Sequence, residues 1–208
     1  MKKVFLVVFA LSAAFLFTSC GDFWENLFGN ITGSATSDIA GERSEYASSI
    51  AMNGTNAGNP FVVGLAMNMD ISELLEIGDA NDLEFPLLCY RLSGNNIKSG
   101  ATLTADNTLT DEDLVDFDYT TLISGKFADN QVVGIAVSPD KYYVMSKGYI
   151  KLDKVKKTKI TGSFSGWAYV IDRTAEPMLS ENQVIISGKF VSRVTPMMAW
   201  VKRLQEKK

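Results

Sequence analysis

The sequence contains no histidine at all among its 208 residues. Histidine is the usual general base near neutral pH and the commonest protein ligand of transition metals. Its absence excludes Ser-His-Asp and Cys-His catalysis, and also zinc, copper and haem centres that need imidazole ligands. No other pattern in the chain indicates a catalytic or metal-binding centre. We therefore expect a protein that is not an enzyme and that has neither a cofactor nor a metal site.

Cysteine is almost as scarce, with two residues. Cys89 lies within the apolar run 85–90 (FPLLCY). We expect its thiol to be buried and inert, because a reactive thiol needs a partly exposed and electropositive environment. Cys20 lies at the end of an N-terminal signal, described next, in which it is modified. One thiol then remains, so we expect no intramolecular disulfide.

Long hydrophobic runs are limited to residues 4–17, and this run is shorter than the roughly 20 residues that a membrane-spanning helix needs. Lys2 and Lys3 precede it, and small residues follow it, which is typical of a secretory signal. The segment LFTSC, which ends at Cys20, resembles the lipobox of bacterial lipoproteins, although Phe17 stands where that motif prefers a smaller aliphatic residue. The resemblance implies a signal peptide over 1–19, acylation of Cys20 with palmitate or a similar chain, and a lipid anchor in the cell envelope. We expect the outer membrane, with periplasmic and surface-facing orientations both open.

Basic residues are outnumbered by acidic ones. The precursor has a formal charge of −4, and removal of Lys2 and Lys3 with the signal leaves 18 basic and 24 acidic residues, a charge of −6. Nucleic acids and anionic lipid surfaces attract clusters of Lys and Arg. We therefore expect no nucleic-acid partner, and a membrane contact made through the lipid at Cys20.

The remaining chain is long enough for one domain. Residues 22–29 (DFWENLFG) fit a short helix with a capping box, and 30–49 fit either a tether or a first edge strand. We assign residues 20–45 to this lipidated N-terminal part and residues 46–208 to a single β domain. Runs of β-branched and aromatic residues, separated by Gly, Asn and Asp, predict strands near 46–53, 60–68, 85–92, 100–104, 119–127, 131–137, 142–153, 158–171 and 183–194.

This pattern predicts an all-β fold, namely an antiparallel β-sandwich with two or three short helices at connections. A closed meander barrel of the lipocalin type is the alternative. Capping boxes indicate helical segments at 70–77 and 110–117. Thr195 and Pro196 fit the start of a C-terminal helix, for which a closing strand is the alternative.

One short pattern, Ile-Ser/Thr-Gly-x-Phe, occurs three times, at 123–127, 160–164 and 186–190. In a strand, its Ile, Gly and Phe point to the same face. A glycine at that position lets a neighbouring ring or backbone approach closely. We interpret the pattern as architectural rather than functional.

Three segments in the C-terminal half together resemble uncharacterised Bacteroidota lipoproteins. They are 143–152 (YVMSKGYIKL), 159–166 (KITGSFSG) and 184–190 (VIISGKF), all within the C-terminal third of the chain. The resemblance implies an all-β secreted domain with no assigned activity. It therefore adds a location and a fold class but no function.

Two motifs have a chemical interpretation that we set aside. Ser138 and Lys141 have the S-x-x-K spacing of penicillin-binding enzymes, but the intervening Pro139 and Asp140 favour a turn between two strands. The carboxylates near 73–84 and 106–118 would serve a hydrolase or calcium only if they converge, and an acidic protein offers many such pairs.

A basic run at Lys151, Lys154, Lys156, Lys157 and Lys159 bridges two predicted strands and could contact phosphate or an anionic glycan.

The strand 164–171 has apolar residues on both faces, so one face lies on the core and the other is either covered or exposed. An exposed face would present Trp167 and Tyr169 as an aromatic platform of the kind on which sugars stack. Tyr143 and Tyr149, on the preceding strand, would extend it. These four residues are our candidate ligand-binding residues.

The expected function is a non-catalytic, lipid-anchored binding or assembly module of the cell envelope, with a glycan or an envelope protein as its partner. The first alternative is a carrier that holds a small apolar ligand inside a barrel. The second is a hydrolase that uses two carboxylates.

Overall fold

The computed structural model describes residues 33–68, 85–114, 117 and 131–196. Within these ranges the chain forms ten strands and one short helix, α4 (Asp111–Leu114). The predicted helices at 22–29, 70–77 and beyond 196, the predicted strand at 119–127 and Cys20 lie outside the described residues. The strands are β1 (Ser34–Ile39), β2 (Glu42–Tyr46), β3 (Ser48–Asn56), β4 (Asn59–Met67), β5 (Leu87–Ser93), β6 (Thr102–Asp106), β7 (Val132–Ser138), β8 (Lys141–Lys156), β9 (Lys159–Asp172) and β10 (Val184–Pro196).

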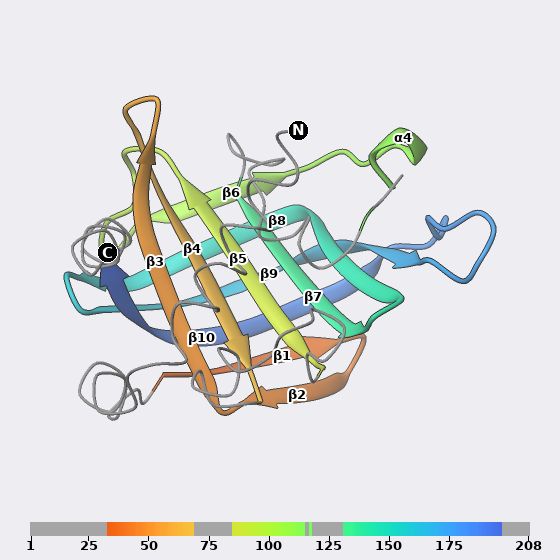
Figure 1. The fold of residues 1–208 in the computed structure, drawn as a ribbon, viewed down its shortest axis with the longest axis horizontal. Coiled ribbons are helices and arrows are strands. Elements are labelled where there is room, and N and C mark those ends of the chain that lie inside the picture. The colour runs from red at the N-terminus through yellow and green to blue at the C-terminus, as the bar shows by residue number, and fades with distance from the viewer. Residues whose placement is uncertain (1–32, 69–84, 115–116, 118–130, 197–208) are drawn as a thin grey trace, which may run out of the picture.

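The strands form two layers that cross steeply (Figure 1). The front layer contains β3, β4, β5 and β7, and the rear layer contains β2, β1, β10, β9, β8 and β6. All neighbouring strands are antiparallel except β10 and β3, which are parallel at Arg193–Pro196. The predicted all-β, largely antiparallel sandwich is confirmed.

Two long strands join the layers at the corners. β8 pairs with β7 over its first residues and with β6 farther along, while β9 covers its other edge throughout. β10 likewise pairs first with β1 and then, from Arg193, with β3. The hydrogen-bonded path therefore returns to β3, so the sandwich is joined at both corners and its two layers enclose one interior.

The interior is filled by large apolar side chains. Tyr90 and Phe190 stack with ring centroids 4.2 Å apart. The two described copies of the repeated pattern lie on neighbouring strands, where Phe190 is opposite Gly162 and Phe164 is opposite Gly188. A Cβ on either glycine would lie within 2.7 Å of the opposing ring. The predicted close approach at these glycines is confirmed, and it is reciprocal.

A second apolar cluster lies on the other side of the front layer. It includes the buried side chains of Cys89 and Ile171, and Phe117 contacts Tyr142 edge-on at 5.5 Å between centroids. Burial raises the pKa of the Cys89 thiol to about 12. The expected burial of Cys89 is therefore confirmed, and its thiol is held in the neutral, unreactive form.

The β domain begins earlier than predicted. Residues 34–46 are not a tether but form the hairpin β1–β2, in which the hydroxyls of Ser37 and Tyr46 are 2.9 Å apart and buried. The turn at Ala40 and Gly41 has positive φ at both residues, as a two-residue hairpin of this kind requires. The edge-strand alternative for this region is therefore the correct one.

The predicted elements at two other connections have different outcomes. At the first, the backbone N–H and hydroxyl of Thr110 both donate to the Asp113 carboxylate at 2.9 Å, so the carboxylate half of the predicted capping box forms at the start of α4. At the second, Thr195 and Pro196 do not start a helix, because β10 continues through them beside Met52 and Asn53 of β3. Up to Pro196, the closing-strand alternative is correct.

Candidate functional site

Several of the candidate residues lie on the surface of the rear layer that points away from the interior. Along β9 the side chains alternate, with Ile160, Phe164 and Ala168 buried in the interior cluster. The residues between them point outward, and pairing with β8 and β10 extends them into rows across three strands. We call this surface the outer face. It consists of Lys147, Tyr149, Lys151, Lys154 and Lys156 on β8, the odd-numbered residues 159–167 on β9, and the odd-numbered residues 185–193 on β10.

One end of the outer face is aromatic. Trp167, Ile185 and Tyr149 are 51%, 55% and 47% exposed, and they are the exposed large hydrophobic residues in the described part of the chain. Ile185 is directly opposite Trp167 across the β9–β10 pair. Tyr149 is opposite Ser165, two residues from Trp167, so it is a diagonal neighbour of the indole. Three exposed apolar side chains from three strands therefore share one patch.

A β-bulge positions this patch. The pairing of β8 with β9 shifts between Met145 and Lys147, which leaves Ser146 as the extra residue. The buried hydroxyl of Ser146 lies 3.1 Å from the carbonyl of Trp167 and 2.8 Å from Oε1 of Gln183. Ser146 thus ties the backbone under Trp167 to the segment that leads into β10. Bulges of this kind often re-aim side chains next to functional sites.

The four predicted platform residues are only partly brought together. Trp167 and Tyr149 share the exposed patch, so for these two residues the exposed alternative is the correct one. Tyr169 is on the same strand but packs, partly buried, against the second apolar cluster. Tyr143 does not belong to the platform, because it packs against the interior cluster on the opposite side of the sheet. The bulge at Ser146 is the cause, since one extra residue reverses the alternation between Tyr143 and Tyr149.

Ile185 is a member of the patch that the sequence patterns did not single out. A signal for it existed, because the pattern at 186–190 places Ile186 and Phe190 on the core face. In a strand, the residue before Ile186 must then face outward. Ile185 was overlooked because it stands in an apolar run, Val184–Ile186, that is typical of a buried strand.

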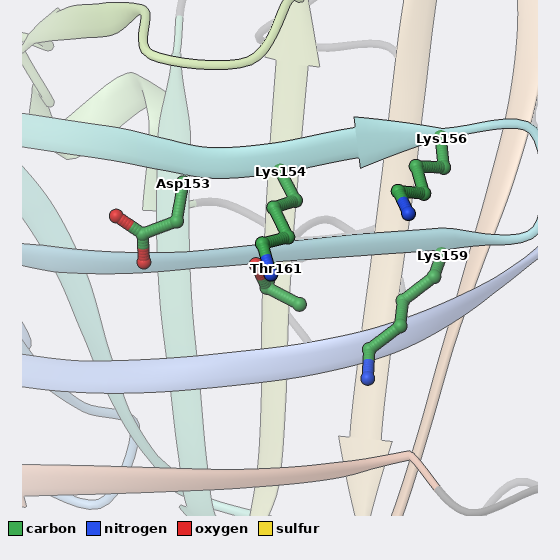
Figure 2. Close-up of a pocket in the computed structure, with 5 residues that line it drawn as sticks. All are labelled: Asp153, Lys154, Lys156, Lys159 and Thr161. Carbon is green, nitrogen blue, oxygen red and sulfur yellow. The ribbon is translucent and has the colours of Figure 1, made fainter.

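The other end of the outer face is basic and concave. A hollow of about 410 Å³ is lined by Asp153, Lys154, Lys156, Lys159 and Thr161 at the tip of the β8–β9 hairpin. Figure 2 shows the side chains of Lys154, Lys156 and Lys159 extending over the same surface of the two strands. A second register shift, between Leu152 and Lys154, restores the alternation that Ser146 reversed. The predicted bridging of two strands by the basic run is confirmed.

The remaining candidate chemistry is not assembled among the described residues. Ser138 and Lys141 end and begin two paired strands with a two-residue turn between them, as predicted, so they share no helix. No group of three or more acidic or cysteine side chains is placed to hold a metal in the described ranges. The hollow of about 420 Å³ beside α4 has a single carboxylate, Glu176, in its lining. The acidic segment 79–84 lies outside the described residues.

Comparison with known proteins does not add to this geometry. No family model, curated protein or solved structure matches the chain. In the described ranges, no helix has the length and apolar character needed to cross a membrane. The case for a function therefore depends on the outer face itself.

Proposed function

We propose that the protein is a non-catalytic, lipid-anchored module of the bacterial cell envelope that binds a polysaccharide on the outer face. Its anchor is the lipid at Cys20, as the signal segment implies. The observation that carries the proposal is the exposed patch of Trp167, Tyr149 and Ile185. Exposed aromatic rings on a sheet offer the flat π surfaces on which sugar rings stack.

The surroundings of the patch favour a sugar over a protein partner. The row beside Trp167 and Ile185 contains Ser165 and Ser187 next to Tyr149, so hydroxyl groups alternate with the apolar side chains. Sugars need hydrogen-bonding groups close to each stacking surface. A stable protein interface instead has a contiguous, mostly apolar core, which these hydroxyls interrupt.

The two alternatives have less support. A carrier needs an enclosed apolar cavity, whereas the described interior is occupied by stacked and buried rings such as Tyr90 and Phe190. A hydrolase needs two carboxyl groups that face each other across a cleft. Neither hollow described above has two carboxylates in its lining.

The first prediction concerns Trp167. Trp167→Ala should weaken polysaccharide binding about tenfold, which corresponds to about 1.4 kcal/mol, because the stacking surface is lost. Trp167→Phe should retain most of the affinity, since a smaller ring still offers a π face. Gel-mobility shifts of the full chain in matrices that contain defined soluble polysaccharides would measure this. Equal retardation of Trp167→Ala and the wild type would contradict the proposal.

A matched control is available on the same strand. Tyr169→Phe keeps the ring that packs against the second cluster and removes only its hydroxyl. It should therefore bind like the wild type. If the chain binds no polysaccharide but captures an envelope protein through Trp167, the protein-binding alternative replaces the proposal.

A further inference from the structure

The basic end of the outer face is distinctive in an acidic protein. The whole chain has a formal charge of −4. Five lysines nevertheless point outward from neighbouring strands at this end, which we call the basic half: Lys151, Lys154 and Lys156 on β8, Lys159 on β9 and Lys189 on β10. The average charge of the protein repels polyanions, so an anion that binds does so because of this local arrangement.

These lysines are not neutralised by the described fold. None of the five forms an ion pair with a residue that the structure describes, and the hollow at the hairpin tip has one carboxylate, Asp153, among three lysines. Lys156 and Lys159 are directly opposite each other as the last pair before the turn. Like charges in opposite positions of a β pair are destabilising. A bound anion would relieve this repulsion.

The basic half and the aromatic patch form one continuous track. Lys159 and Trp167 lie on the same side of β9, eight residues apart, which at about 3.3 Å per residue is a distance of about 26 Å. The outward side chains between them are those of Thr161, Ser163 and Ser165. In the row through Ser163, Lys151 and Lys189 flank the hydroxyl on both sides. A linear ligand that lies along β9 would meet the lysines of the basic half, then hydroxyls, then the aromatic patch, where Lys147 is directly opposite Trp167.

We propose that the ligand of the outer face is an acidic polysaccharide. Its carboxylate or sulfate groups bind the lysines of the basic half, and its sugar rings stack on Trp167 and Tyr149. This inference rests on the proposed function and specifies its substrate class. The complementarity of charge is the reason to prefer an acidic polymer, and the length of the track is the reason to prefer a polymer over a single sugar.

Two pairs of polymers that differ in charge test the inference on the full chain. Dextran sulfate is compared with dextran, and polygalacturonate with its methyl ester, by isothermal titration calorimetry at about 50 mM salt, where screening is modest. The charged member of at least one pair should bind at least tenfold more tightly than its neutral counterpart. The double variant Lys156→Gln/Lys159→Gln should lose that preference, and it should melt at a higher temperature than the wild type because the cross-strand repulsion is removed.

The matched control removes two positive charges elsewhere. Lys141→Gln/Arg173→Gln changes the first residue of β8 and the residue directly after β9, at the end opposite the hairpin tip, so it alters the net charge equally while the basic half stays intact. It should keep the preference for charged polymers. An equal loss in both double variants would overturn the inference, because net charge rather than the basic half would then control binding.

Other outcomes separate this inference from the proposed function. If neutral and charged polymers bind equally through Trp167, the outer face binds polysaccharide but the inference about acidic groups is overturned. If no polysaccharide binds, both are overturned. If the lysines are needed only for binding to phosphatidylglycerol vesicles, the basic half serves a membrane surface, and the inference is again overturned.

Discussion

At the scale of single residues, three titratable side chains are kept neutral by burial. Loss of solvation raises the pKa of Tyr46 to about 12, although its hydrogen bond with Ser37 opposes the shift. Burial raises the pKa of Cys89 to about 12 as well. It also raises the pKa of Tyr90, whose hydroxyl donates to Ser192 at 2.7 Å. In each case the charged form is the one that the folded state disfavours.

This arrangement predicts a loss of stability at alkaline pH. In the unfolded chain, Cys89 and the tyrosines release protons near their ordinary pKa values of 9.0 and 10.0. Because the folded-state values are higher, the stabilisation is complete below about pH 9 and is lost as the pH rises toward 12. Each group should lower the free energy of unfolding by up to about 1.4 kcal/mol per pH unit in this window.

Urea unfolding curves between pH 8 and pH 12 would measure this slope. Tyr46→Phe removes one of the titrating hydroxyls, so its stability should fall less steeply between pH 10 and pH 12. Identical slopes for Tyr46→Phe and the wild type would show that Tyr46 titrates alike in both states.

At the scale of elements, the pairing of β9 with β10 depends on Gly162 and Gly188, each of which lies against a phenylalanine ring of the other strand. A Cβ on Gly188 would lie 2.5 Å from Cζ of Phe164 and 2.2 Å from the backbone carbonyl oxygen of Thr36. The ring could rotate away, but the carbonyl belongs to the paired strand β1 and cannot move without disturbing the ladder. The two strands that flank β10, namely β1 and β9, therefore leave no room for a side chain at Gly188.

Gly188→Ala should accordingly lower the free energy of unfolding by about 1–3 kcal/mol, the usual cost of overpacking. Chemical denaturation would measure it. Gly188→Ala combined with Phe164→Leu should not restore the wild-type value, because the contact with Thr36 remains. Ser187→Ala, one residue away on the outward side, should change stability by less than about 0.5 kcal/mol.

At the scale of the whole molecule, the proposed anchor and the outer face come from different parts of the sequence. The outer face is formed by β8, β9 and β10, whereas the expected lipid attachment is at Cys20, before the first described strand. The acidic net charge opposes adsorption to an anionic bilayer. Membrane attachment should therefore depend on the acyl chains and not on the folded domain.

Cys20→Ser should move the protein from the membrane fraction to the soluble fraction, and it should abolish labelling with radioactive palmitate. Cys89→Ser, a control with the same chemical change at the buried thiol, should leave both unchanged. Retention of Cys20→Ser in the membrane fraction would mean that another part of the chain holds the protein there.

Local patterns in the sequence determined much of the fold. The spacing of Ile160, Phe164, Ile186 and Phe190 predicts which face of β9 and β10 lies on the core. The same spacing predicts that Trp167 lies on the opposite face. Such predictions succeed because side-chain direction in a strand has a fixed period of two. The predictions at Thr110 and at the turn with Pro139 were also correct, because each depends only on residues that are neighbours in sequence.

Tertiary structure decided what depends on pairing between distant segments. The bulge at Ser146 turned Tyr143 away from Tyr149, and nothing in the local alternation marks that position. The parallel pairing with β3 carried β10 through Thr195, where local signals favoured a helix. Cross-strand register also brought Ile185 beside Trp167 and placed five lysines from three strands on the same face. The sequence by itself specified which residues face outward along most of a strand, whereas contacts across strands decided which of them form a site.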